Sequence, residues 1–213
     1  MRKTKLFKRI SAFVLASAFV CGSIYSASAS KTGSSPSAQI LYGSTYTGTE
    51  QRLRDAFSSA TSGFSSTFDI TFTLSSVNSS TALNRPRNCS DVCSTFCCGS
   101  SNCDSSHSNG GMRILRKMSS NSTFRIGVVG HVLCYGTGGK HARIAGIAEF
   151  PGESRRTVIT TEVGFTLKYL MQHELSHNLG VRTHCSSQCV MNEDNTYVDK
   201  WCTTHSNDIK NNK

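Results

Sequence analysis

The 213-residue chain lacks several features that would assign it to a common class of protein. It has no apolar run long enough to cross a membrane as a stable helix, because its main apolar run covers only residues 10–24. It has no basic run with interleaved aromatic residues, which argues against nucleic-acid binding. The Gly-rich turn between Tyr135 and Ala142 lacks the ending of a phosphate-binding loop. No long segment precedes Gln39, so we expect no latency through a separate prodomain.

The N-terminus has the features of a secretory signal peptide. Five basic residues precede the apolar run, namely Arg2, Lys3, Lys5, Lys8 and Arg9. Ala27-Ser28-Ala29 is typical of a signal peptidase site, so residues 1–29 are predicted to be removed. The mature protein is then secreted without a membrane anchor. Its formal charge falls from +10 to about +5, an ordinary value for a secreted domain.

The use of cysteine agrees with export. The chain has ten cysteines, of which nine remain once Cys21 is removed. Five of them lie in an irregular insert at about 88–111: Cys89, Cys93, Cys97, Cys98 and Cys103. Disulfides are the default interpretation in an exported domain, and a metal cluster that includes His107 is the alternative. Because nine is odd, at least one thiol is unpaired or binds metal.

The mature chain alternates strand and helix patterns, which predicts an α/β (α+β) fold. A Ser-rich, flexible segment at 30–38 precedes a single domain at 39–213. Period-two or buried apolar patterns predict strands at 39–46, 68–74, 124–135, 142–150 and 157–163. Helical spacing predicts a helix from a capping box of Thr47 and Glu50 to Gly63, and a second helix over about 164–179. Residues 75–88 are predicted to be a loop by composition.

The stretch QHELSHNLGVRTHCSSQCVMN, from Gln172 to Asn192, carries the candidate chemistry. Its pattern H-E-x-x-H places His173 and His177 one turn apart on one face of a helix, where both can reach one zinc ion. Glu174 follows in sequence, where its carboxylate can accept a proton from a metal-bound water. Gly180 ends the helix and lets the chain turn back.

Together with Gly180, a later histidine and Met191, this pattern resembles that of the metzincin zinc endopeptidases. The stretch HCSSQCVM is also similar to the corresponding stretch of archaemetzincins, with one residue fewer between its cysteines. The resemblance implies a twisted mixed sheet with a backing helix, an active-site helix and an antiparallel edge strand along the substrate cleft. It also implies that Met191 lies in a tight turn below the metal, without ligating it.

The position of the third ligand departs from the family pattern. In that pattern the ligand stands three residues after the glycine, where this chain has Thr183, a poor ligand for zinc. Either the turn bulges by one residue and His184 binds, or another residue does, of which Cys185 is the nearest.

The predicted function is a secreted zinc-dependent endopeptidase that acts on protein or peptide substrates as a monomer. Three protein ligands leave one zinc position open for the water that Glu174 activates. One alternative is a catalytically inactive, disulfide-stabilised binding protein, in which the shift from Thr183 to His184 has destroyed the site. Another is a zinc peptidase that acts on the envelope of the producing cell.

A second, structural zinc is the last candidate site. Its ligands would be Cys185, Cys189, Cys202 and His205, which are spaced C-x3-C-x12-C-x2-H. Archaemetzincins carry a comparable zinc with four cysteines. The remaining six cysteines of the mature chain, Cys134 included, could then close three disulfides. The alternative is a disulfide that joins Cys202 to Cys185 or Cys189.

Overall fold

The computed structural model describes residues 34–84, 110–119, 123–131, 133–137, 140–151, 155–162, 164–186, 188–192 and 198–213. The predicted signal peptide and the five cysteines of the insert lie outside these residues. The segment from Lys31 to Lys213 forms one compact unit.

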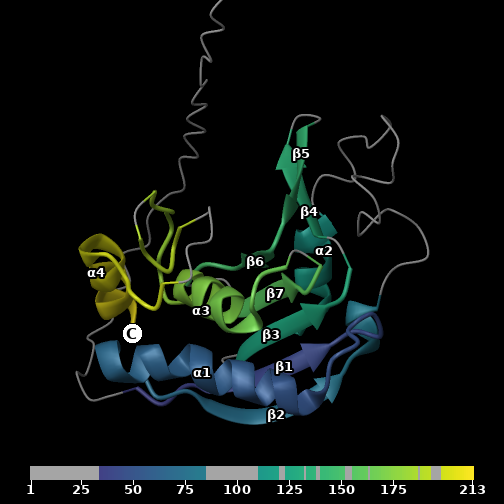
Figure 1. The fold of residues 1–213 in the computed structure, drawn as a ribbon, viewed down its shortest axis with the longest axis horizontal. Helices are drawn as coiled ribbons and strands as arrows, with labels where there is room; N and C mark the ends of the chain where they lie inside the picture. Colours follow the sequence, from purple (N-terminus) through teal and green to yellow (C-terminus); the bar gives the residue numbers. More distant parts are fainter. Residues whose placement is uncertain are drawn as a thin grey trace, which may run out of the picture. The chain divides into compact units, whose positions relative to one another are not determined.

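The centre of this unit is a five-stranded mixed sheet with the strand order β2-β1-β3-β7-β6 (Figure 1). Its strands are β1 (Ser37–Tyr42), β2 (Thr73–Ser79), β3 (Phe124–Val129), β7 (Arg156–Thr160) and β6 (Gly146–Ala148). The first four run parallel, whereas β6 pairs antiparallel with β7 at one edge. A separate antiparallel pair is formed by β4 (Leu133–Thr137) and β5 (Lys140–Ile144). The mixed sheet with an antiparallel edge strand, predicted from the sequence, is confirmed.

Helices pack on both faces of the sheet. The described helices are α1 (Glu50–Phe68), α2 (Gly110–Lys117), α3 (Leu167–Asn178) and α4 (Thr203–Asn212), with a short 3-10 turn at Thr81–Leu83. Of these, α1 and α3 pack on one side of the sheet and α2 on the other, whereas α4 packs against α1. Ile126 and Val128 of β3 belong to the core shared with α1 and α3, whereas Val129 belongs to the core shared with α2. Strand β3 is therefore buried on both sides, which explains its mostly apolar sequence.

The first helix differs from its predicted bounds at both ends. Its N-cap is Thr49, whose side chain accepts a hydrogen bond from the backbone N–H of Arg52, so the predicted capping box at Thr47 was wrong. The helix also continues past Gly63 to Phe68. Phe64 and Phe68 are one turn apart and both pack against Trp201, and this distant contact favours the longer helix.

The second strand lies later in the sequence than its alternating pattern predicts. The strand predicted at 68–74 was wrong for most of its length, because β2 begins at Thr73 and extends through residues predicted to be a loop. Parallel pairing with β1, for example Val77 opposite Ile40, supplies backbone hydrogen bonds that composition does not reveal.

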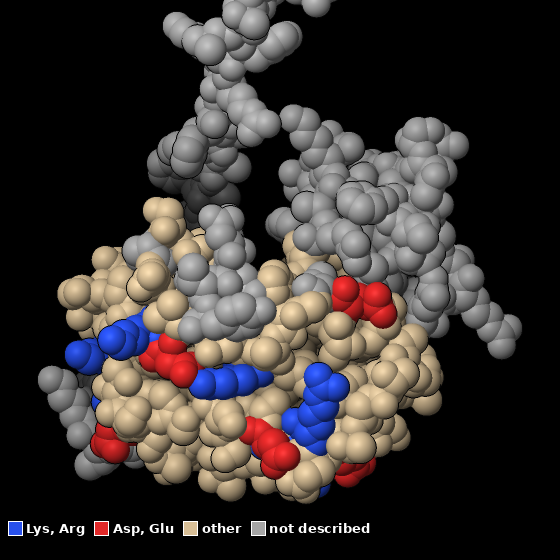
Figure 2. All heavy atoms as spheres, in the orientation of Figure 1, with Lys and Arg blue, Asp and Glu red and all other residues tan. Residues whose placement is uncertain are grey.

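The surface in view carries charges of both signs. Figure 2 shows acidic and basic side chains interspersed over the described part of this face. None of the described helices is both long enough and apolar enough to cross a membrane.

Candidate metal centres

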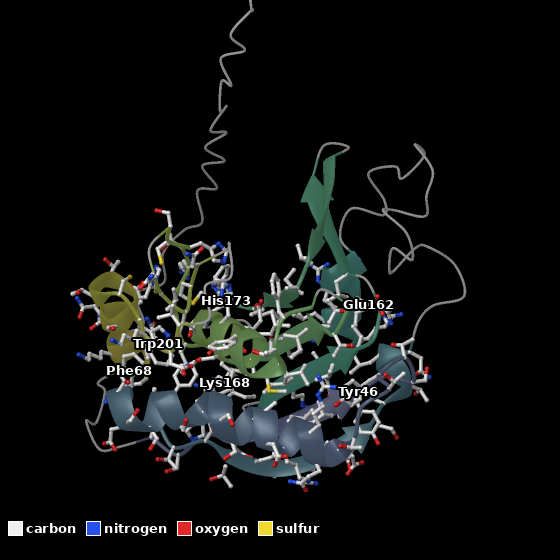
Figure 3. All side chains as sticks on the ribbon, in the orientation of Figure 1. Tyr46, Phe68, Glu162, Lys168, His173 and Trp201 are labelled. Atoms are coloured by element: carbon white, nitrogen blue, oxygen red, sulfur yellow. The ribbon has the colours of Figure 1, made fainter. Side chains whose placement is uncertain are left out.

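Helix α3 presents two histidines on the side that does not pack into the core. Leu170, Met171 and Leu175 are buried among the residues of α1 and the sheet. His173 and His177 lie one turn apart, and their ring centroids are 5.0 Å from each other. Figure 3 shows His173 on the side of α3 that faces away from α1. The helical period therefore separates packing side chains from candidate ligands, as the sequence predicts.

The backbone directs the same nitrogen of each histidine toward a common point. His173 Nδ1 lies 2.9 Å from the carbonyl oxygen of Val190, and His177 Nδ1 lies 2.6 Å from that of Val181. A neutral imidazole that donates through Nδ1 keeps its Nε2 lone pair for a metal.

Burial favours the neutral form of both rings. Burial, together with the nearby His177, lowers the pKa of His173 to about 3. Burial likewise lowers the pKa of His177 to about 4. Both imidazoles are therefore neutral at physiological pH, which is the form that binds a metal.

The chain after α3 brings His184 to the same point. Gly180 has φ +106°, a backbone conformation that favours glycine. His184 Nε2 then lies 3.2 Å from His173 Nε2 and 3.1 Å from His177 Nε2. Ligand nitrogens about 2.0–2.1 Å from a tetrahedral zinc would be about 3.3 Å apart. The donor set and its spacing therefore fit zinc.

The residues on either side of His184 point elsewhere. Thr183 Oγ1 lies 3.3 Å from His205 Nε2, and Cys185 belongs to a second group of potential ligands. Of the three residues considered for the third position, the structure brings only His184 to the two helix histidines.

Glu174 is buried beside this triad. Its side chain is 5% exposed, and a Cβ at Gly146 of β6 would collide with its carboxylate. Burial raises the pKa of Glu174 to about 8. A cation held by the neighbouring histidines would lower that pKa, because it favours the carboxylate.

Met191 lies in the turn that closes the segment after α3. It is fully buried, and its carbonyl oxygen accepts a hydrogen bond of 3.1 Å from the backbone N–H of Cys185. Cys185 and Asn192 also form an isolated bridge. The turn therefore ties Met191 to the residue that follows His184.

A second group of ligand atoms comes from Cys185, Cys189, Cys202 and His205, which all lie within 4.8 Å of one another. Cys189 and His205 are buried, and the backbone N–H of Cys202 lies 3.3 Å from Cys189 Sγ. Burial raises the pKa of the Cys189 thiol to about 11 and lowers the pKa of His205. Among the described cysteines, none of these three sulfurs is in a disulfide. Three thiols and an imidazole at this spacing fit a tetrahedral zinc site.

Sequence reasoning missed several groups that shape the histidine centre. The carbonyl oxygens of Val181 and Val190 orient the helix histidines, and no side-chain pattern could reveal them. Phe150 lies edge-on to His177, with ring centroids 5.9 Å apart, and Arg182 stacks over Phe150. Phe150 is the last residue of the strand predicted at 142–150 and precedes Pro151, and this position was the only available signal.

Comparisons with known proteins support the fold. The sequence matches no family model and no curated protein. The structure is similar to the crystal structure of archaemetzincin from Methanopyrus kandleri, with a TM-score of 0.55 and 14% sequence identity. The match covers 86% of this chain and 98% of that one. At this identity the likeness establishes the fold alone.

Proposed function

We propose that this chain is a secreted zinc-dependent endopeptidase. The observation that carries the proposal is the convergence of three imidazole Nε2 atoms, 3.1 and 3.2 Å from His184 to the other two, beside a buried carboxylate. This arrangement stands on a fold similar to that of archaemetzincin. Zinc bound there would supply an acidified water and polarise the carbonyl of the scissile bond.

The protein groups around the metal perform the remaining chemistry. His173, His177 and His184 would hold the ion. Glu174, as its carboxylate, accepts the proton of the attacking water and passes it to the leaving amine. The contact between Gly146 and Glu174 places β6 directly beside the reacting groups. Because β6 is at the edge of the sheet, its outer side offers backbone groups to an extended peptide.

The inactive alternative receives less support from this geometry. The hypothesis of an inactive binding protein was based on the extra residue before His184, which was expected to displace the third ligand. In the structure Thr183 turns toward His205 while His184 reaches the other histidines, so the extra residue does not separate the triad. The third possibility, a peptidase that acts on the envelope of the producing cell, differs from the main proposal only in its substrate. A screen of envelope and soluble peptides distinguishes these two possibilities.

A second zinc at the cysteine centre is part of the proposal. Its support is the grouping of Cys185, Cys189, Cys202 and His205 within 4.8 Å. Such a site would link the turn around Cys189 to the first turn of α4.

Peptide cleavage by the purified mature chain tests the catalytic proposal. We expect cleavage that a chelator abolishes and that zinc restores. Glu174→Ala should retain zinc and lose at least about 100-fold in kcat, because only the proton acceptor is removed. Undiminished turnover in this variant would refute the mechanism, and an inert wild-type chain with bound zinc would favour the binding-protein alternative.

Removal of His184 tests the assignment of the third ligand. His184→Ala should weaken zinc binding at the histidine centre by more than the roughly 100-fold that loss of an outer hydrogen-bond partner can cost. Competition with a chromophoric chelator measures this affinity. Ser186→Ala, an exposed change two residues away, is the matched control. Equal affinities in both variants would show that His184 is not a ligand.

A further inference from the structure

His205 is held through both of its ring nitrogens, by two different parts of the chain. Its Nδ1 lies 3.4 Å from Cys189 Sγ, and its Nε2 lies 3.3 Å from Thr183 Oγ1. The side chain is 2% exposed, so water has little access to either nitrogen. Only Nδ1 therefore faces the cysteine group.

The tautomer of His205 follows from this arrangement. A metal ligand nitrogen must carry a lone pair, so a metal among the thiols requires Nδ1 without a proton and Nε2 with one. The Nε2–H then needs an acceptor, and the hydroxyl oxygen of Thr183 is the group at that position. Partners of this kind fix both the tautomer and the ring orientation of a ligating histidine.

Thr183 occupies a particular place in the chain. It immediately precedes His184, which joins the histidine centre, and Cys185, which joins the cysteine centre. Thr183 also occupies the position at which the metzincin pattern has its third metal ligand, with the histidine one residue later. A contact with His205 accounts for a hydroxyl side chain at position 183. Thr183 is not among the ligands of the histidine centre.

We propose that Thr183 is a positioning residue for the cysteine centre: its hydroxyl accepts from Nε2 of His205 and so presents Nδ1 as the fourth ligand. This inference rests on the second zinc of the proposed function. It is independent of whether the chain cleaves peptides.

The test compares Thr183→Val, Thr183→Ser and Ser186→Ala with the wild-type protein. Valine has the shape of threonine and places a methyl group where the hydroxyl was, which leaves the Nε2–H without an acceptor. Serine retains the hydroxyl. Ser186 is exposed on the same segment and serves as a control for nonspecific effects.

Two readouts do not depend on peptidase activity. In the cobalt-substituted protein, sulfur-to-cobalt charge-transfer absorption reports the cysteine centre. Long-range proton–nitrogen NMR of the zinc-loaded protein reports which nitrogen of His205 carries the proton. We expect Nε2 protonated in the wild-type protein and a roughly 10- to 100-fold weaker metal affinity at the cysteine centre in Thr183→Val. Thr183→Ser should restore most of that affinity, and Ser186→Ala should match the wild type.

The proposal is overturned if Thr183→Val binds metal at the cysteine centre as tightly as the wild type, or if Nδ1 carries the proton. Wild-type protein with no sulfur-to-cobalt band would remove the second centre, and this inference with it. In that case chelator-sensitive cleavage would still decide the catalytic proposal separately.

Discussion

At the level of single residues, burial controls the protonation of the groups in the histidine centre. His173 and His177 are neutral because burial disfavours their cationic forms. Glu174 is buried without a neighbouring cation among the described residues, and burial raises its pKa to about 8. An ionised carboxylate in such surroundings reduces stability, and in the proposed mechanism it is the base.

The buried carboxylate makes stability depend on pH in a defined direction. Because the pKa of Glu174 in the folded protein lies above its ordinary value of 4.5, the protonated form favours folding. Its stabilising contribution is complete below about pH 4.5 and is lost as the pH rises toward about 8. In chelator-treated protein, the unfolding free energy of Glu174→Gln minus that of the wild type should therefore be larger at pH 9 than at pH 5.

Urea unfolding at the two pH values measures this difference. The comparison between the variant and the wild type cancels the titration of groups that do not interact with residue 174. A difference in unfolding free energy that is independent of pH would show that Glu174 does not titrate abnormally in the folded protein.

At the level of helices and strands, α1 begins at a position set by a local contact and ends at a position set by a distant one. The N-terminus is set locally, because Thr49 caps the backbone N–H of Arg52. The C-terminus is set by the packing of Phe64 and Phe68 against Trp201, which is far away in sequence. Asp69 closes the helix in the left-handed conformation, with φ 57°.

Because Thr49 caps α1, alanine substitutions at Thr49 and Thr47 should reduce the free energy of unfolding by different amounts. Thr49→Ala should reduce the free energy of unfolding by about 1 kcal/mol, since the first turn loses a side-chain acceptor. Thr47→Ala should have little effect, because Thr47 is exposed and outside the helix. Thermal or urea unfolding of the two variants measures both costs. A larger loss of unfolding free energy in Thr47→Ala than in Thr49→Ala would show that Thr47 caps the helix, as the sequence predicts.

At the scale of the whole molecule, the segment after α3 connects both candidate centres. His184 and Cys185 are neighbours but belong to different centres. Val190, whose carbonyl orients His173, directly follows Cys189. Trp201 donates from Nε1 to Ser176 Oγ at 2.8 Å, and it immediately precedes Cys202 (Figure 3).

Because one segment carries residues of both centres, a substitution that disrupts the cysteine centre should also weaken zinc binding at the histidine centre. Cys189→Ser should lower the zinc content from about two ions per chain to about one. It should also weaken zinc binding by the histidines, because the turn that carries Val190 loses its metal link. Zinc analysis after dialysis and chelator competition measure both effects.

The oxidation state of the three cysteines provides an independent check. Mass spectrometry of the unreduced protein should find Cys185, Cys189 and Cys202 as thiols. A disulfide that includes any of them, together with one zinc per chain, would rule out the second centre.

The features that depend on neighbouring residues and on donor chemistry could be predicted from the sequence. Helical spacing places His173 and His177 on one face, and the glycine at Gly180 ends that helix, because both effects act within a few residues. The alternation of strand and helix patterns likewise indicated an α/β fold, and the metzincin resemblance implied that its sheet is mixed.

The groups that meet across long stretches of chain could be identified only in the folded protein. The path of the chain through Gly180 and the Met191 turn brought His184, rather than Thr183 or Cys185, to the helix histidines. Pairing with β1 turned a polar segment into β2, and Trp201 favoured the longer α1. These outcomes depend on contacts between residues far apart in sequence, whose energies outweigh weak local preferences that composition and spacing report.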